Sequence, residues 1–155
     1  VNINLANVPV ENATFTPAPT AVPTTVPATS APATQANLVG GVIVFEPSQP
    51  TCAQTFVVGF DVANLGSQPT AASGTVSLVD TRTADGSQQG TTIGGFPILQ
   101  PGQTFRVTMP LTISTYYAEQ HTITLVVDST GQIPETNEGD NTRTQTYTLA
   151  KGSCP

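Results

Sequence analysis

The stretch His121–Leu149, HTITLVVDSTGQIPETNEGDNTRTQTYTL, decides the fold because it contains two alternating strands joined by an acidic turn. The first arm places Ile123, Leu125 and Val127 on one face and threonines on the other, the period of two that is typical of a half-buried strand. The second arm repeats this pattern with Tyr147 on the apolar face. Leu149 lies on the same apolar face of this arm. The opposite face carries four threonines, Thr142, Thr144, Thr146 and Thr148. Glycine, asparagine, aspartate and proline fill the connection, so we predict an antiparallel hairpin with a long, ordered loop.

Alternating apolar segments also precede this hairpin. The clearest core strand runs from Phe56 to Val62, and Phe105–Leu111 alternates in the same way around Pro110, whose place in mid-strand predicts a sheet edge or a bulge. Three further strands are expected at Leu38–Phe45, with a bulge at Gly40 and Gly41, around Val76 and Leu78, and at Thr91–Leu99. Seven strands separated by turn signals, without helical periodicity, predict an all-β, seven-stranded antiparallel sandwich.

The acidic turn carries a family resemblance. A strand that ends in Asp128 is followed by Ile-Pro-Glu-Thr-Asn-Glu at residues 133–138 and then by Asp140-Asn141, which opens the last strand. This order resembles the C-terminal signature of the CARDB family, which comprises bacterial and archaeal adhesion-related domains. Three earlier segments are similar to the middle of the same family: Pro47–Pro50, Val62–Asp80 and Leu99–Met109. The resemblance covers residues 36–149 and implies an immunoglobulin-like sandwich outside the cell, without a catalytic motif.

Composition limits the possible partners. The 155 residues include only 4 lysines and arginines against 10 aspartates and glutamates, so a nucleic acid would be repelled. No apolar run approaches the ~18 residues that a membrane span needs. The sequence starts at Val1 without methionine, and we therefore expect a mature form from which a signal peptide has been removed.

The first 35 residues differ from the rest. In residues 1–15 an alternating apolar strand has no neighbouring strand in sequence, and Asn12-Ala13-Thr14 is a sequon for N-glycosylation. In residues 16–35 proline, threonine and alanine dominate, which favours an extended polyproline II spacer, with a disordered stalk as the alternative. The spacer threonines that we consider for O-glycosylation are Thr20, Thr24, Thr25, Thr29 and Thr34. The sandwich domain is then expected at residues 36–155.

The two cysteines, Cys52 and Cys154, are predicted to form a disulfide. In an immunoglobulin-like strand order, the first turn and the end of the last strand lie at the same pole, because six reversals separate the first and seventh strands. Cys52 lies in that turn and Cys154 lies just past the last strand, so the two can meet. A disulfide suits an oxidising compartment, whereas two free thiols would suit the cytosol.

The acidic turn is also the one place where the sequence suggests a ligand. Its hard oxygen donors suit calcium in kind, although their spacing is not that of an EF-hand. The candidate ligands are Asp128, Glu135, Glu138 and Asp140, with carbonyl groups from Asn137 and Asn141. The alternative is that these side chains satisfy turn amides, which we favour, and no cofactor is therefore predicted.

Catalysis is not expected. The only histidine, His121, begins a strand with inward parity and is interpreted as a histidine at the rim of the sandwich. A nucleophilic serine or cysteine therefore lacks a base, and no glycine-rich phosphate loop leads into a helix. Carbohydrate binding would need exposed aromatic side chains, and the candidates are the adjacent Tyr116 and Tyr117, one of which we expect to pack into a corner of the sandwich.

Two functions remain. In the first, the chain is a structural subunit of an extracellular filament, and its N-terminal strand adds to the sandwich of a neighbouring copy, because an unpaired strand requires an open sheet edge. The competing outcome is that this strand adds to its own domain, which would give a monomer. The contacting side chains would be Val1, Ile3, Leu5, Val8 and Val10. In the second, the chain is a stalked adhesion or carbohydrate-binding module for surface glycans that does not polymerise.

Overall fold

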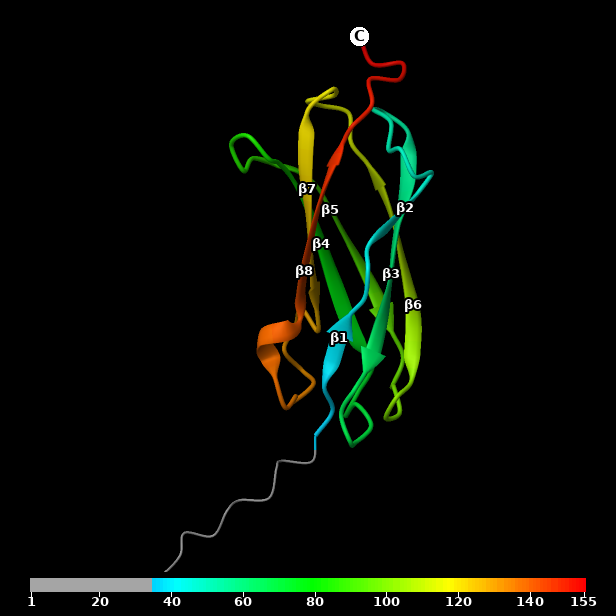
Figure 1. Cartoon of the computed structure of the whole chain (residues 1–155), viewed down its shortest axis with the longest axis vertical. Helices are drawn as coiled ribbons and strands as arrows, with labels where there is room; N and C mark the ends of the chain where they lie inside the picture. The colour runs from blue at the N-terminus through cyan, green and yellow to red at the C-terminus, as the bar shows by residue number, and fades with distance from the viewer. Residues whose placement is uncertain (1–34) are drawn as a thin grey trace, which may run out of the picture. The chain divides into compact units, whose positions relative to one another are not determined.

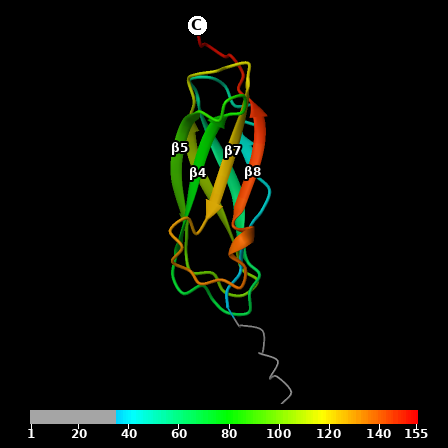
Figure 2. The same ribbon diagram turned by 90° about the vertical axis from the view of Figure 1, so that its left-hand side faces the viewer.

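The computed structural model describes residues 35–155, which form two antiparallel β-sheets packed face to face (Figures 1 and 2). In one sheet, β3 (Thr55–Asn64) pairs with β1 (Leu38–Gly40) and β2 (Val44–Glu46) on one side and with β6 (Thr104–Thr112) on the other. The second sheet has the order β5-β4-β7-β8. Its strands are β5 (Gln88–Phe96), β4 (Gly74–Arg82), β7 (Gln120–Val127) and β8 (Thr142–Thr148), with the short 3-10 helix η1 (Glu138–Asp140) before β8. The predicted all-β sandwich is confirmed.

The first strand is interrupted rather than continuous. Gly40 pairs with Val62 and Val44 pairs with Gly59, so residues 41–43 face only residues 60 and 61 of β3. This extra residue is a bulge at the pair of glycines that predicted it. Because β1 and β2 pair with the same strand, they count together as the first of seven strands.

The predicted hairpin is confirmed, with β7 and β8 pairing from Gln120↔Thr148 to Val126↔Thr142. Ile123, Leu125 and Val127 are fully buried, while the threonines of β8 face solvent. These inward side chains meet the buried face of β3, which includes Phe56 and Phe60, between the two sheets. The alternation of the sequence therefore places the core as expected.

On one lateral side of the sandwich the edge strands are β5 and β6. Within residues 35–155, these two strands pack closely against each other and leave no opening between the sheets. A Cβ on Gly94 would lie 2.7 Å from Val107 and 2.8 Å from Met109, and one on Gly90 would lie 2.6 Å from Ile113. The two glycines thus let side chains of β6 and the residue just after it lie directly on β5. The strand predicted at Thr91–Leu99 instead begins at Gln88 and ends at Phe96, because residues 83–87 already complete the turn after β4.

Cys52 and Cys154 form the predicted disulfide, with Cα atoms 6.0 Å apart. The bond joins the turn before β3 to the segment after β8, where the amide of Cys52 also donates to the carbonyl oxygen of Ala150. Residues 35–155 contain no helix with the length and apolar character that a membrane crossing requires. The predictions for Val1–Val10, for glycosylation of Asn12 and for the spacer threonines lie outside the described residues.

Candidate functional site

The acidic turn between β7 and β8 is organised by hydrogen bonds from its own backbone. Asp128, which has a φ of 46°, accepts from the amides of Ile133 at 2.8 Å and Gln132 at 3.2 Å. The Asn137 side chain accepts from the amide of Gly139 at 3.0 Å and so caps η1. These side chains satisfy turn amides, as in the alternative that the sequence left open.

Glu135 connects this turn to the first strand. Its buried carboxylate accepts from the amide of Leu38 and, at 3.0 Å, from the side-chain amide of Asn141. The loss of hydration on burial raises the pKa of the Glu135 carboxyl. Glu138 accepts from the amide of Glu135 at 3.1 Å, and Asp140 accepts from Asn37 at 3.3 Å. Of the predicted calcium ligands, Glu135 and Asp140 therefore hold β1 and the residue before it against the turn.

These carboxylates do not assemble into a metal centre. Among residues 35–155, no three histidine, cysteine, aspartate or glutamate side chains are grouped as a metal ion would require. Two asparagine oxygens and one aspartate oxygen around the turn are buried without a partner: Asn37 Oδ1, Asp140 Oδ1 and Asn141 Oδ1. The candidate ligands are therefore not grouped as a metal site within residues 35–155, and the expected lack of calcium binding stays a prediction for solution measurements.

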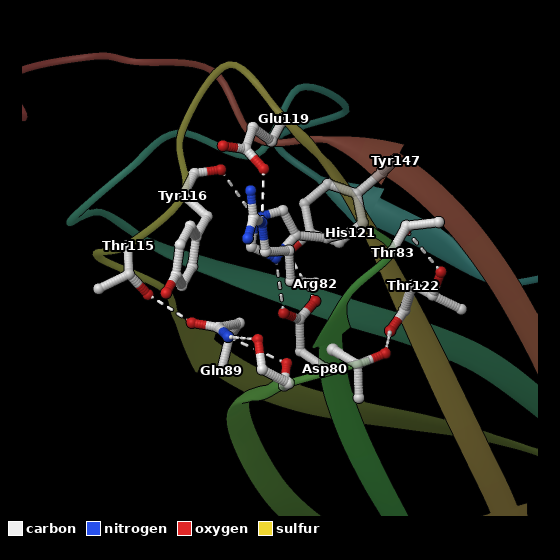
Figure 3. Close-up of polar contacts among 12 residues, drawn as sticks. Asp80, Arg82, Thr83, Gln89, Thr115, Tyr116, Glu119, His121, Thr122 and Tyr147 are labelled. Carbon is white, nitrogen blue, oxygen red and sulfur yellow. Dashed lines mark hydrogen bonds and ion pairs between the residues drawn. The ribbon is translucent and has the colours of Figure 1, made fainter. Parts of the chain in front are cut away.

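A buried polar network, which the sequence analysis did not find, lies at the opposite end of β7 (Figure 3). The Nδ1 atom of His121 lies 2.8 Å from Oδ1 of Asp80, and Tyr147 donates its hydroxyl proton to Oδ2 of Asp80 at 2.8 Å. The Nε2 atom of His121 lies 3.1 Å from the carbonyl oxygen of Tyr116, which can only accept, so Nε2 donates. His121 faces inward as predicted, but its predicted rim position is wrong because the side chain is fully buried.

Burial sets the electrostatics of this network. Burial raises the pKa of the Asp80 carboxyl. The hydrogen bonds from His121 and Tyr147 act in the opposite direction and lower this pKa, but the effect of burial is larger. Burial and the adjacent Asp80 raise the pKa of the Tyr147 phenol. Both ring nitrogens of His121 therefore have hydrogen-bond partners within the buried network.

Cations cover the two tyrosines considered for sugar binding. Tyr116 is 42% exposed, but the guanidinium of Arg82 lies 4.3 Å from the centre of its ring (Figure 3). Tyr117 packs against the core, as we expected for one of the pair, with the Lys151 ammonium 5.5 Å from its ring centre. Neither ring therefore presents two open faces to a sugar.

The second lateral side of the sandwich, between β8 and the first strand, is open. In the described residues β8 pairs with β7 and with no other strand. A pocket of about 360 Å³ is lined by residues 40–43 from the β1–β2 bulge and residues 143–145 from β8. Val42, which is part of this lining, and Val44, two residues further on, are 78% and 42% exposed. An unpaired strand edge, a pocket and exposed aliphatic side chains thus occur together.

A model of the CARDB family matches residues 36–145, which is more than half of the sequence. The chain belongs to the CARDB family. The match contains the acidic turn that carried the resemblance and ends within β8. It makes residues 36–145 a surface- or adhesion-type domain, consistent with the disulfide.

Solved structures agree on the fold of this CARDB domain. A CARDB domain from Pyrococcus furiosus, solved in complex with di-metal ions, is 16% identical with a TM-score of 0.57, and the alignment covers 76% of this chain and 96% of that one. A domain assigned to a cell surface protein of Methanosarcina acetivorans is 20% identical with a TM-score of 0.50, covering 74% and 92%. At such identities the likeness shows the fold alone.

The same architecture also occurs within longer proteins. The alkylpurine DNA glycosylase AlkC of Pseudomonas fluorescens is 11% identical with a TM-score of 0.51, and the alignment covers 74% of this chain but only 31% of the glycosylase. No curated protein matches the sequence.

Proposed function

We propose that the chain is a structural subunit of an extracellular filament or surface appendage, in which residues 1–10 of one copy add as a strand to the sandwich of the next. The observation that carries this proposal is the unpaired edge of β8 in the described residues. A free edge presents backbone donors and acceptors that a strand from another chain can pair with. Because donor and acceptor are different surfaces, the contact is asymmetric and propagates unless a ring closes.

The family assignment and the disulfide both support a location of the protein outside the cell. CARDB domains are adhesion-related, and the Cys52–Cys154 disulfide is stable in an oxidising compartment. The network around His121 holds both ring nitrogens in hydrogen bonds, which supports a role without catalysis. The second candidate, a carbohydrate-binding module on a stalk, lacks a comparable observation because Arg82 and Lys151 lie over the two tyrosines.

Electron microscopy and light scattering of the intact chain test the proposal. We expect filaments from the unmodified protein and none from the double variant Ile3→Asp/Leu5→Asp, whose charges lie on the apolar face of the donor strand. The matched control is Asn2→Asp/Asn4→Asp, which adds the same charge to the opposite face and should still assemble. Filaments from Ile3→Asp/Leu5→Asp, or none from the unmodified chain, would show that strand addition does not build this protein into a polymer.

A further inference from the structure

The two lateral sides of the sandwich differ in their ability to accept a strand. On the β5–β6 side, Gly90 and Gly94 bring the sheets into direct contact, and Pro110 lacks an amide donor. Backbone pairing shows which way Pro110 faces. The Asn64 amide donates to the Gln103 carbonyl, so odd-numbered residues of β6 face β3 and Pro110 faces outward. That edge is packed and interrupted by proline, which is how natural sheets block unwanted pairing.

The β8 edge has the opposite character. The Val127 amide donates to the carbonyl of Asn141, and the Leu149 amide donates to Glu119, so odd-numbered residues of β8 pair with β7. Thr144 and Thr146 therefore direct their amides and carbonyls away from β7. Within the described residues, no hydrogen bond is made by these four backbone groups.

Two side-chain hydrogen bonds cross the open side and limit the length of the β8 edge that is accessible between them. At one end, Arg143 donates from Nε to the carbonyl oxygen of Gly40 at 2.8 Å. At the other end, Gln49 donates to the carbonyl oxygen of Thr148 at 2.7 Å. Between these bridges lie Thr144, Thr146 and the pocket lined by residues 40–43 and 143–145.

We propose that this opening, between β8 and the β1–β2 bulge, is the acceptor site for residues 1–10 of a second copy of the chain. The occupant is uncharged in its side chains up to Val10 and alternates apolar with polar residues, as a strand beside the exposed Val42 and Val44 requires. Thr144 and Thr146 supply its backbone partners, and the pocket receives an apolar side chain. The 34 residues that precede the described part contain the spacer, which spans about 55 Å if extended, longer than β8.

This inference rests on the proposed function, and its test separates the two. The full-length Ile3→Asp/Leu5→Asp variant serves as acceptor, because its own donor strand is disabled and its β8 edge is free. A peptide of residues 1–10 is titrated into it, and backbone amide shifts are recorded by NMR. We expect the largest changes at Thr144, Thr146 and Val42.

Two pairs of variants on this acceptor locate the site. Thr144→Pro removes an outward amide from β8, and its control Thr108→Pro removes an outward amide from β6. Val42→Asp places a charge in the lining of the pocket, and its control Ile93→Asp places the same charge on β5, away from the pocket, where the side chain is similarly exposed at 72%. We expect Thr144→Pro and Val42→Asp each to weaken peptide binding about tenfold, and the controls to leave it unchanged.

Each outcome has one meaning. Peptide shifts confined to β5 and β6, or equal effects of the variants and their controls, overturn the acceptor site even if the intact chain forms filaments. Shifts at β8 in a protein that forms closed oligomers but no filaments leave the acceptor site standing and refute the open polymer. Shifts at β8 in a protein that stays monomeric overturn the second copy as the occupant. Absence of peptide binding overturns the acceptor site whether or not filaments form, because a filament would then use another contact.

Discussion

The imidazole Nδ1 of His121 lies 2.8 Å from Oδ1 of Asp80, with both side chains fully buried, and this pair joins the two central strands of its sheet. The backbone alone would bring β4 and β7 together. The buried pair adds a register requirement, because a slip of one residue would turn either polar group to the opposite face of the sheet.

We expect Asp80→Ala to lower the free energy of unfolding by ~3–5 kcal/mol, because it leaves His121 and Tyr147 buried without their partner. Urea denaturation followed by circular dichroism measures this. The control is Asp61→Ala, which breaks the exposed pair with Arg106 and should cost less than ~1 kcal/mol. Equal losses from the two variants would mean that the buried network contributes no more than a surface ion pair.

The turn between β4 and β5 contains a carboxyl group, that of Asp85, for which we expect an unusually low pKa. Hydrogen bonds from the Ser87 hydroxyl and amide, followed by Arg82, lower the pKa of Asp85 to about 2. Any stability that this carboxylate contributes is present above its unfolded pKa of ~3.9 and is lost as the pH falls towards 2.

NMR titration of the Asp85 carboxyl carbon should show this low value, and Ser87→Ala should raise it. Ser77→Ala, in mid-strand on β4, serves as the control and should leave it unchanged. A normal pKa in the unmodified protein would rule out the hydrogen-bonded turn.

Glu135 is expected to be the residue of the acidic turn that matters most for stability. Glu135→Ala removes the acceptor of the buried Leu38 amide and of Asn141, and should cost ~1–3 kcal/mol. Hydrogen exchange of the Leu38 amide should accelerate in the same variant. Glu46→Ala changes an exposed glutamate on β2 and should stay within ~0.5 kcal/mol.

We predict no response of the protein to calcium. Asp128, Glu135 and Glu138 already accept hydrogen bonds from the turn, so binding an ion would break contacts that the fold uses. The melting temperature in millimolar calcium should equal that in excess chelator. A rise with calcium that Asp128→Asn abolishes would instead establish a site there.

Alternation along the strands made most of the fold predictable. The inward residues of β3, β7 and β8, the edge position of Pro110 and the Cys52–Cys154 bond all follow from period, proline chemistry and the order of antiparallel strands. Strand ends were less predictable, since β5 starts at Gln88, three residues earlier than expected. Glutamine and glycine carry a weak strand preference there, and pairing with β4 decides the outcome.

The buried network was missed although its signal was in the sequence. Asp80 continues the inward parity of Val76 and Leu78, and an aspartate at such a position requires a buried partner. His121 and Tyr147 have the same parity in the hairpin, where they are paired directly. The open side could not have been inferred, because it depends on where the bulge at residues 41–43 lies relative to β8.

The disulfide also determines how the domain responds to mechanical load. Cys52 and Cys154 enclose β3 to β8 in one covalent loop, whereas β1 and β2 lie outside it. Tension transmitted along the chain from residue 35 would therefore peel β1 and β2 from β3 and then be borne by the sulfur bridge. Only residues 35–51 could unravel, to a total length of about 60 Å at most, while the remaining six strands stay enclosed. Oxidation thus turns the domain from an extensible element into a short, nearly inextensible link.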